Sequence, residues 1–156
     1  MNGKPKAWLG IDPGMTGAIA LIDEDDQVIV ADWLGALDMH KTLMFWMDIY
    51  DIQMAMLERV SGRKGNSAKS NTTFMRHVGE WVAILRLCEL PWAEVLPTIW
   101  MKRRLPAKKD KDDKPSLAYV RAKYPDINLI GPRGGPKDGR SDAVCIAEFA
   151  REKGKL

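Results

Sequence analysis

The stretch AWLGIDPGMTGAIALIDEDDQVIVADW, residues 7–33, decides the fold of this chain. An apolar run over residues 7–11 stops at Asp12, which opens an Asp-Pro-Gly turn signal, and a second apolar run follows over residues 17–23. This pair of runs predicts a β-hairpin. A polar turn separates the hairpin from a third apolar run, residues 28–33. We therefore expect three consecutive antiparallel strands.

Beyond this stretch, helical and extended patterns alternate. The expected elements are a helix over residues 38–51 with Asp38 as its N-cap, a strand over 52–60, a helix over 71–90, a strand over 92–96, a short helix over 97–101 and two helices over 115–123 and 138–153. Polar segments over residues 61–70 and 102–114 are typical of loops. This order predicts an α/β fold with a mixed five-stranded sheet, three strands antiparallel and then two parallel, flanked by helices.

Length and composition agree with one globular domain. The 156 residues, 46% of them hydrophobic, are enough for a single domain over residues 1–156 with a substantial core. Lysine and arginine number 24 against 21 aspartates and glutamates, so the formal net charge is +3. A mildly basic chain with a pI near 8.9 is compatible with a polyanionic partner.

Residue counts also exclude several classes of protein. Cys88 and Cys145 are distant in sequence, and with only His40 and His77 available they form neither a zinc-ligand pattern nor a disulfide scaffold. The longest apolar stretch, near residues 17–22, is far shorter than the roughly 20 residues of a membrane span, and the first residues are polar. We expect a cytoplasmic protein with reduced thiols and no membrane partner.

Four acidic residues fall at the ends of predicted elements. Asp12 follows the first strand, Glu58 lies near the end of the fourth, and Asp138 and Asp142 are four residues apart on the last helix. That spacing places both aspartates on one face of the helix. Carboxylate oxygens are the ligands that Mg²⁺ prefers, and a two-metal site needs several of them close together. The four acids are therefore candidate metal ligands.

Each acid also has an ordinary structural interpretation. Asp12 stands where a β-turn favours aspartate, and Asp138 and Asp142 suit the first turn of a helix as N-cap and as partner of the helix dipole. Glu58 is different, because an acid that follows the apolar sequence MAML in a central strand is costly to bury without a partner. A functional role is favoured for Glu58, and the conjunction of all four acids is stronger than each alone.

Five segments together resemble a known family. They are LGIDPGMTGAIALID at 9–23, MLERV at 56–60, VGEWVAILRL at 78–87, EVLPTIWMKRRL at 94–105 and DGRSDAVCIAEFA at 138–150. In this order and spacing they resemble RuvC-type Holliday junction resolvases of the ribonuclease H-like superfamily. The first segment alone is also similar to the phosphate loop of actin and the sugar kinases, but the five in order are specific to the resolvases.

The resemblance implies a nuclease that acts in DNA recombination and repair. Carried over residue by residue, it makes Asp12, Glu58, Asp138 and Asp142 the catalytic acids, which would hold two Mg²⁺ ions, with Mn²⁺ able to substitute. The substrate would be branched DNA, principally four-way junctions, and the product would carry a 5′-phosphate. Gly139 occupies the position where cellular RuvC has an acid, and the spacing of four resembles the phage and plastid branches. A phage protein would act in the host cytoplasm.

Basic residues complete the implied site. Lys102 matches a family lysine near the scissile phosphate, where it would stabilise charge. The residues expected to contact the DNA backbone are Arg63, Lys64, Lys69, Lys102, Arg103, Arg104, Lys108, Lys109 and Lys111. Taken alone, such a basic run is also typical of a solvated loop.

Quaternary structure follows from the reaction. Resolving a junction takes two symmetrical cuts, so we expect a homodimer, with the apolar-rich helix over residues 71–90 as candidate interface. In the family an aromatic residue just after the second acid probes the junction centre, but residues 59–62 contain none. Phe74 is the nearest candidate, and its place in the helical stripe favours core packing. The alternative functions are a junction-binding module without catalysis and an ATP-binding domain of the actin type, which would require a second such domain.

Overall fold

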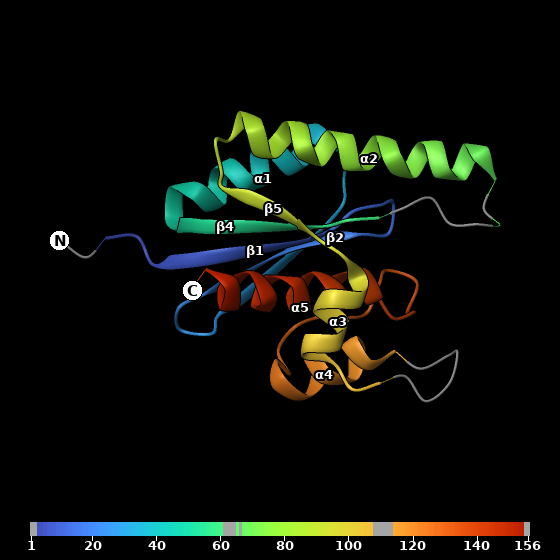
Figure 1. Ribbon diagram of the computed structural model, residues 1–156. Helices are drawn as coiled ribbons and strands as arrows, with labels where there is room; N and C mark the ends of the chain where they lie inside the picture. Colours follow the sequence, from blue (N-terminus) through green and yellow to red (C-terminus); the bar gives the residue numbers. More distant parts are fainter. Residues whose placement is uncertain (1–2, 61–64, 66, 108–113, 155–156) are drawn as a thin grey trace.

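The computed structural model describes residues 3–60, 65, 67–107 and 114–154 (Figure 1). Its elements in chain order are β1 (Lys6–Asp12), β2 (Ala18–Asp23), β3 (Val28–Asp32), α1 (Ala36–Ile49), β4 (Asp51–Glu58), α2 (Ala68–Leu87), β5 (Trp92–Val95), α3 (Pro97–Arg104), α4 (Pro115–Lys123) and α5 (Asp138–Lys153). Among these residues, no helix is long and apolar enough to cross a membrane.

The strands form one mixed sheet in the order β3-β2-β1-β4-β5. Strand β2 pairs antiparallel with both β1 and β3, whereas β4 pairs parallel with β1 and β5 pairs parallel with β4. Three antiparallel strands followed by two parallel ones were expected from the sequence, and the predicted fold class is confirmed.

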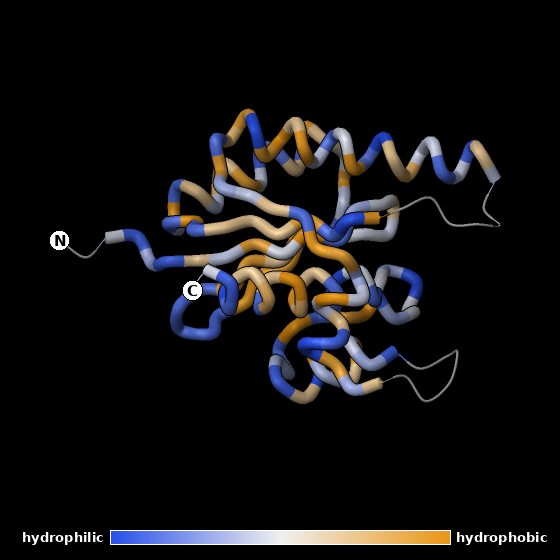
Figure 2. The backbone as a smooth tube through the Cα atoms, viewed as in Figure 1, coloured by the Kyte–Doolittle hydropathy of each residue, from blue (hydrophilic) through white to orange (hydrophobic). Residues whose placement is uncertain are grey.

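Helices cover both faces of the sheet (Figure 1). On one face α1 and α2 bury Leu43, Trp81 and Leu85 against strand residues such as Leu9. On the other face α5 lies against the sheet, with α3 and α4 outside it, and all of the residues of α5 from 143 to 150 are buried. Figure 2 shows that hydrophobic and hydrophilic residues alternate along α2, as expected for a helix with one buried and one exposed face.

Gly10 explains how closely α5 approaches the sheet. A Cβ at this position of β1 would lie 2.1 Å from the carbonyl oxygen of Ala143 and 2.2 Å from the amide nitrogen of Ala147. Only glycine lets the helix backbone rest on the strand backbone. The register of α5 over β1 is therefore fixed by backbone contact, and with it the position of the residues at the start of the helix.

Several predicted boundaries were wrong. Helix α1 begins after Gly35 and not at Asp38, which lies in its first turn and does not cap it. Helix α2 starts within the predicted loop, because the hydroxyl of Ser67 accepts a hydrogen bond from the amide of Ser70 and caps the helix. Helix α3 continues to Arg104, so the first basic residues of the segment predicted as a loop are helical.

Candidate active site

Asp12 and Glu58 end two neighbouring parallel strands. Asp12 is the last residue of β1 and Glu58 the last residue of β4, and the register pairs Ile11 with Leu57 immediately before them. Because the carboxyl ends of parallel strands meet at the same edge of a sheet, the two side chains emerge side by side. Glu58 is buried and Asp12 partly buried.

The start of α5 brings the other two acids to this edge. A Cβ on Gly139 would lie 2.3 Å from the carbonyl oxygen of Thr16 and 3.1 Å from Oδ2 of Asp12. The helix therefore reaches the loop after β1 only because residue 139 has no side chain. An acid at 139 does not fit this arrangement, so Asp138 and Asp142 remain the candidate pair on α5.

Ion pairs fix the orientation of this helix end. The guanidinium of Arg140 donates to both carboxylate oxygens of Asp32 at 2.7 and 2.9 Å, and the ammonium of Lys137 donates to Oδ2 at 3.0 Å. Hydrogen bonds from Arg140, opposed by burial and supported by Lys137, lower the pKa of Asp32 to about 2. Strand β3 is thereby tied to the residues that flank Asp138.

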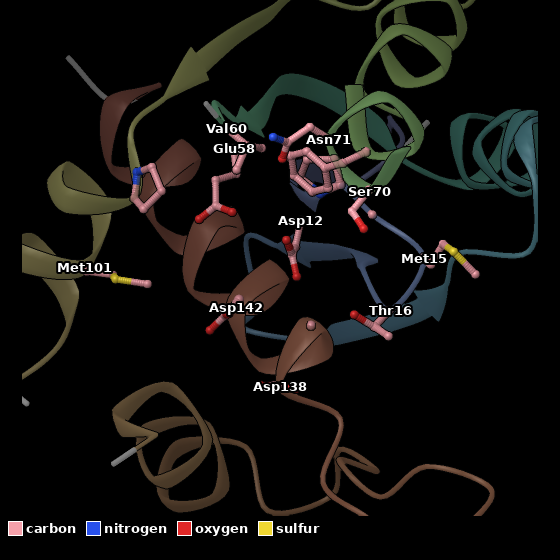
Figure 3. Close-up of a pocket in the computed structure, with 15 residues that line it drawn as sticks. Asp12, Met15, Thr16, Glu58, Val60, Ser70, Asn71, Met101, Asp138 and Asp142 are labelled. Carbon is pink, nitrogen blue, oxygen red and sulfur yellow. The ribbon is translucent and has the colours of Figure 1, made fainter. Parts of the chain in front are cut away.

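All four acids line one cleft of about 440 Å³. Figure 3 shows Asp12 and Glu58 facing the same space, with Asp142 and Asp138 below them on α5. Burial raises the pKa of Asp12 well above its ordinary value, and the negative charges of Glu58, Asp142 and Asp138 raise it further. Crowded carboxylates of this kind are stabilised by a bound cation.

Asp138 is turned towards a cation of the protein itself. Nζ of Lys114 donates to Oδ2 of Asp138 at 2.7 Å. Burial opposes ionisation of this acid, but the hydrogen bond and charge of Lys114 outweigh it, and the pKa of Asp138 is lowered. Within the described ranges, no three Asp, Glu, His or Cys side chains are placed to hold one metal ion as they stand. The donor chemistry fits Mg²⁺, and a shared ion requires the carboxylates on α5 to turn into the cleft.

A tryptophan contact at Glu58 was not predicted from the sequence. The indole nitrogen Nε1 of Trp100 on α3 donates to Oε1 of Glu58 at 2.9 Å, and both side chains are buried. The spacing of Trp100 along α3 carries no signal for this contact, because a buried apolar face predicts the same residue type.

The predicted basic residues fall into three groups. Lys102 lines a second cleft of about 480 Å³ together with Asp138 and Asp142, and exposed Lys69 lies in the first turn of α2. Arg103 and Arg104 both form ion pairs with Glu152 of α5, and only 20% of the Arg104 side chain is exposed. The remaining predicted residues, Arg63, Lys64, Lys108, Lys109 and Lys111, lie outside the described residues.

The core placement predicted for Phe74 was wrong. Its side chain is partly exposed and lines the cleft beside Asp12 and Glu58. A Cβ on Gly14 would lie 3.3 Å from its ring, so the aromatic ring rests against the loop after β1. Phe74 belongs to the apolar stripe of α2. The first part of this helix extends beyond the edge of the sheet, so the sheet does not cover Phe74 as it covers the later residues of the stripe (Figure 1).

Comparison with known proteins finds similar solved structures but no similar sequence. No protein-family model matches the sequence, and a search of curated proteins finds no significant match. Among solved structures, T. thermophilus RuvC in complex with a Holliday junction substrate has a TM-score of 0.60 at 14% identity, over 96% of each chain. A second structure of Thermus thermophilus RuvC has a TM-score of 0.57 at 15% identity, over 95% of this chain and 96% of that one.

A viral resolvase is similar as well. The fowlpox virus resolvase with its Holliday junction DNA has a TM-score of 0.52 at 8% identity, over 94% of this chain and 99% of that one. These likenesses extend over almost the entire chain and bear on the arrangement of its elements. The chain has the ribonuclease H-like fold of the RuvC-type Holliday junction resolvases.

Proposed function

We propose that this chain is a metal-dependent endonuclease that resolves four-way DNA junctions and cuts related branched DNA. The observation that carries the proposal is the cleft at the carboxyl edge of β1 and β4, where Asp12, Glu58, Asp138 and Asp142 lie together. Its support is the shared fold with junction resolvases. The presence of all four acids favours an enzyme over a junction-binding module without catalysis.

The acids would hold Mg²⁺ or Mn²⁺, two ions per site. Bound there, the ions would activate water and stabilise the leaving oxygen of the phosphodiester. Asp12 and Glu58 hold fixed positions at the strand ends, whereas Asp138 must exchange Lys114 for a metal ion. Lys102, beside the two aspartates of α5, supplies positive charge where the scissile phosphate would lie.

Backbone phosphates would meet exposed lysines on both sides of the cleft. Lys69 lies on the α2 side and Lys102 on the α3 side. The predicted contacts of Arg103 and Arg104 compete with their ion pairs to Glu152. We therefore expect Lys69 to contribute more to DNA affinity than the two arginines, whereas Lys102 acts mainly on the scissile phosphate.

Two symmetrical cuts call for a homodimer. The outer layer of α1 and α2 exposes large apolar side chains, with 62% of Phe45 and 74% of Leu87 accessible, and a second copy of this chain would cover them. Trp81 of α2 is fully buried against the sheet and takes no part in that surface. Sedimentation should give twice the mass of 17.6 kDa, and Leu87→Asp should shift it towards the monomer.

The function is tested with isosteric variants of the acids. Asp12→Asn and Glu58→Gln should abolish cleavage of a labelled four-way junction, while junction binding is retained or tightened, because the acids that hold metal also repel phosphate. Circular dichroism should show an unchanged fold. Loss of binding together with cleavage would assign the acids a structural role instead.

A further inference from the structure

The hydrogen bond from Trp100 to Glu58 sets this tryptophan apart from Trp8 and Trp81, the other two that are almost fully buried. Three tryptophans, Trp8, Trp81 and Trp100, are at most 5% exposed. The indole nitrogens of Trp8 and Trp81 have no hydrogen-bond partner among the described residues, whereas that of Trp100 donates to Glu58. Packing therefore accounts for the first two residues, and Trp100 has an additional role.

The chemistry of the pair restricts Glu58. An indole N–H can only donate, and here it donates to the carboxylate oxygen Oε1 and holds it in place. The terminal torsion of a glutamate is soft, and a side chain with no such partner samples a broad range of orientations. The bond from Trp100 restricts this freedom at Glu58, the acid that ends β4 and also interacts with Asp12.

Trp100 is itself rigidly held. Its ring is fully buried in the core cluster on the α5 face of the sheet, which also contains Val95 and Leu117. At the end of the same helix, Arg104 donates to the backbone carbonyl of Glu148 at 2.8 Å and to Oε2 of Glu152 at 2.6 Å. Helix α3 is thus attached to the core at two points, so the indole is a fixed donor.

We propose that Trp100 is a positioning residue that orients the Glu58 carboxylate for metal binding. The inference rests on the proposed function, in which Glu58 holds a divalent cation. Partners that orient metal ligands typically account for about 10- to 100-fold in metal affinity or activity. Trp100 touches neither metal nor DNA in this account and acts only through Glu58.

The test compares Trp100→Phe with Trp81→Phe. Both substitutions shorten a fully buried indole to a phenyl ring, but only the first removes a hydrogen bond. Trp100→Phe should weaken Mn²⁺ binding, measured by calorimetry without DNA, by about 10-fold or more, and should slow single-turnover cleavage of a bound junction by a similar factor. Junction affinity without divalent metal should be unchanged. Trp81→Phe should alter none of the three.

A spectroscopic readout keeps the proposal testable if Trp100→Phe unfolds. In the wild-type protein the indole N–H resonance of Trp100, assigned by triple-resonance NMR, should move on addition of Mg²⁺ and move in Glu58→Ala, while that of Trp81 stays. Mn²⁺ affinity equal to wild type in Trp100→Phe, or an unmoved resonance, overturns the proposal. If the wild-type protein binds Mn²⁺ but cuts no junction, the proposed function fails while calorimetry and NMR still decide the role of Trp100.

Discussion

The contact between β1 and α5 makes a quantitative prediction for Gly10→Ala. The new methyl carbon would approach the Ala143 carbonyl oxygen to 2.1 Å, where an ordinary contact begins at 3.4 Å. A shortfall of more than 1 Å against two backbone atoms cannot be relieved by rotating a side chain. We expect a loss of about 3 kcal/mol in the free energy of unfolding, at the upper end of the range for overpacking. For a domain of this size, that loss lowers Tm by about 6–12 °C.

The same substitution at Gly79 is the matched control. Gly79 lies exposed in the interior of α2, and a Cβ there would meet no atom within 4 Å. Gly79→Ala should raise the free energy of unfolding by about 0.5–1 kcal/mol, because alanine favours the helix. Urea unfolding and calorimetry of both variants measure the difference. A Gly10→Ala variant within about 0.5 kcal/mol of wild type would refute the close approach of α5 to β1.

Three further predictions concern charged residues. Asp32→Asn should lower the free energy of unfolding by about 1 kcal/mol at pH 7, after allowance for solvent screening. Because hydrogen bonds from Arg140 lower the pKa of Asp32 to about 2, urea unfolding should show this difference from wild type above pH 4 and lose it as the pH falls towards 2. A difference that does not depend on pH would contradict this prediction. Glu148→Gln should lower the free energy of unfolding by about 3 kcal/mol, because this buried carboxylate accepts hydrogen bonds from two tyrosines and from Lys123. A change below about 0.5 kcal/mol in the same assay would rule out this stabilising role. Lys102→Ala should slow single-turnover cleavage by about 100-fold with little change in junction affinity, and an effect on affinity alone would make it a phosphate contact only.

The sheet could be predicted because its signals are local. Each apolar run of the first 33 residues is bounded by turn residues, and Asp12 and Glu58 stand where such runs end. The sequence predicted both acids at strand ends, and they lie together because β4 pairs parallel with β1, a pairing that was not predicted. Asp138 and Asp142 were assigned to the same site from their helical spacing and from the family resemblance.

Other features depend on tertiary contacts that leave no local pattern. Arg104 looks like a DNA-binding residue in a basic run, but it pairs with the buried carboxylate of Glu148 and the partly exposed carboxylate of Glu152 on α5. Trp100 looks like a core residue and also holds Glu58. Phe74 follows the apolar stripe of α2, yet lies where the helix passes the edge of the sheet and faces the cleft. In each case the partner comes from a distant part of the sequence.

The central claim is that the four-carboxylate cleft cuts branched DNA with the help of a divalent metal. The most direct measurement incubates the protein with end-labelled four-way junction, fork and linear duplex, with and without Mg²⁺, and resolves the products on a denaturing gel. We predict paired, symmetrical nicks near the branch point of the junction, with 5′-phosphate ends, only when Mg²⁺ is present, and an intact linear duplex. Junction binding without any cleavage in Mg²⁺ or Mn²⁺, or cleavage that persists in Asp12→Asn, would contradict the account.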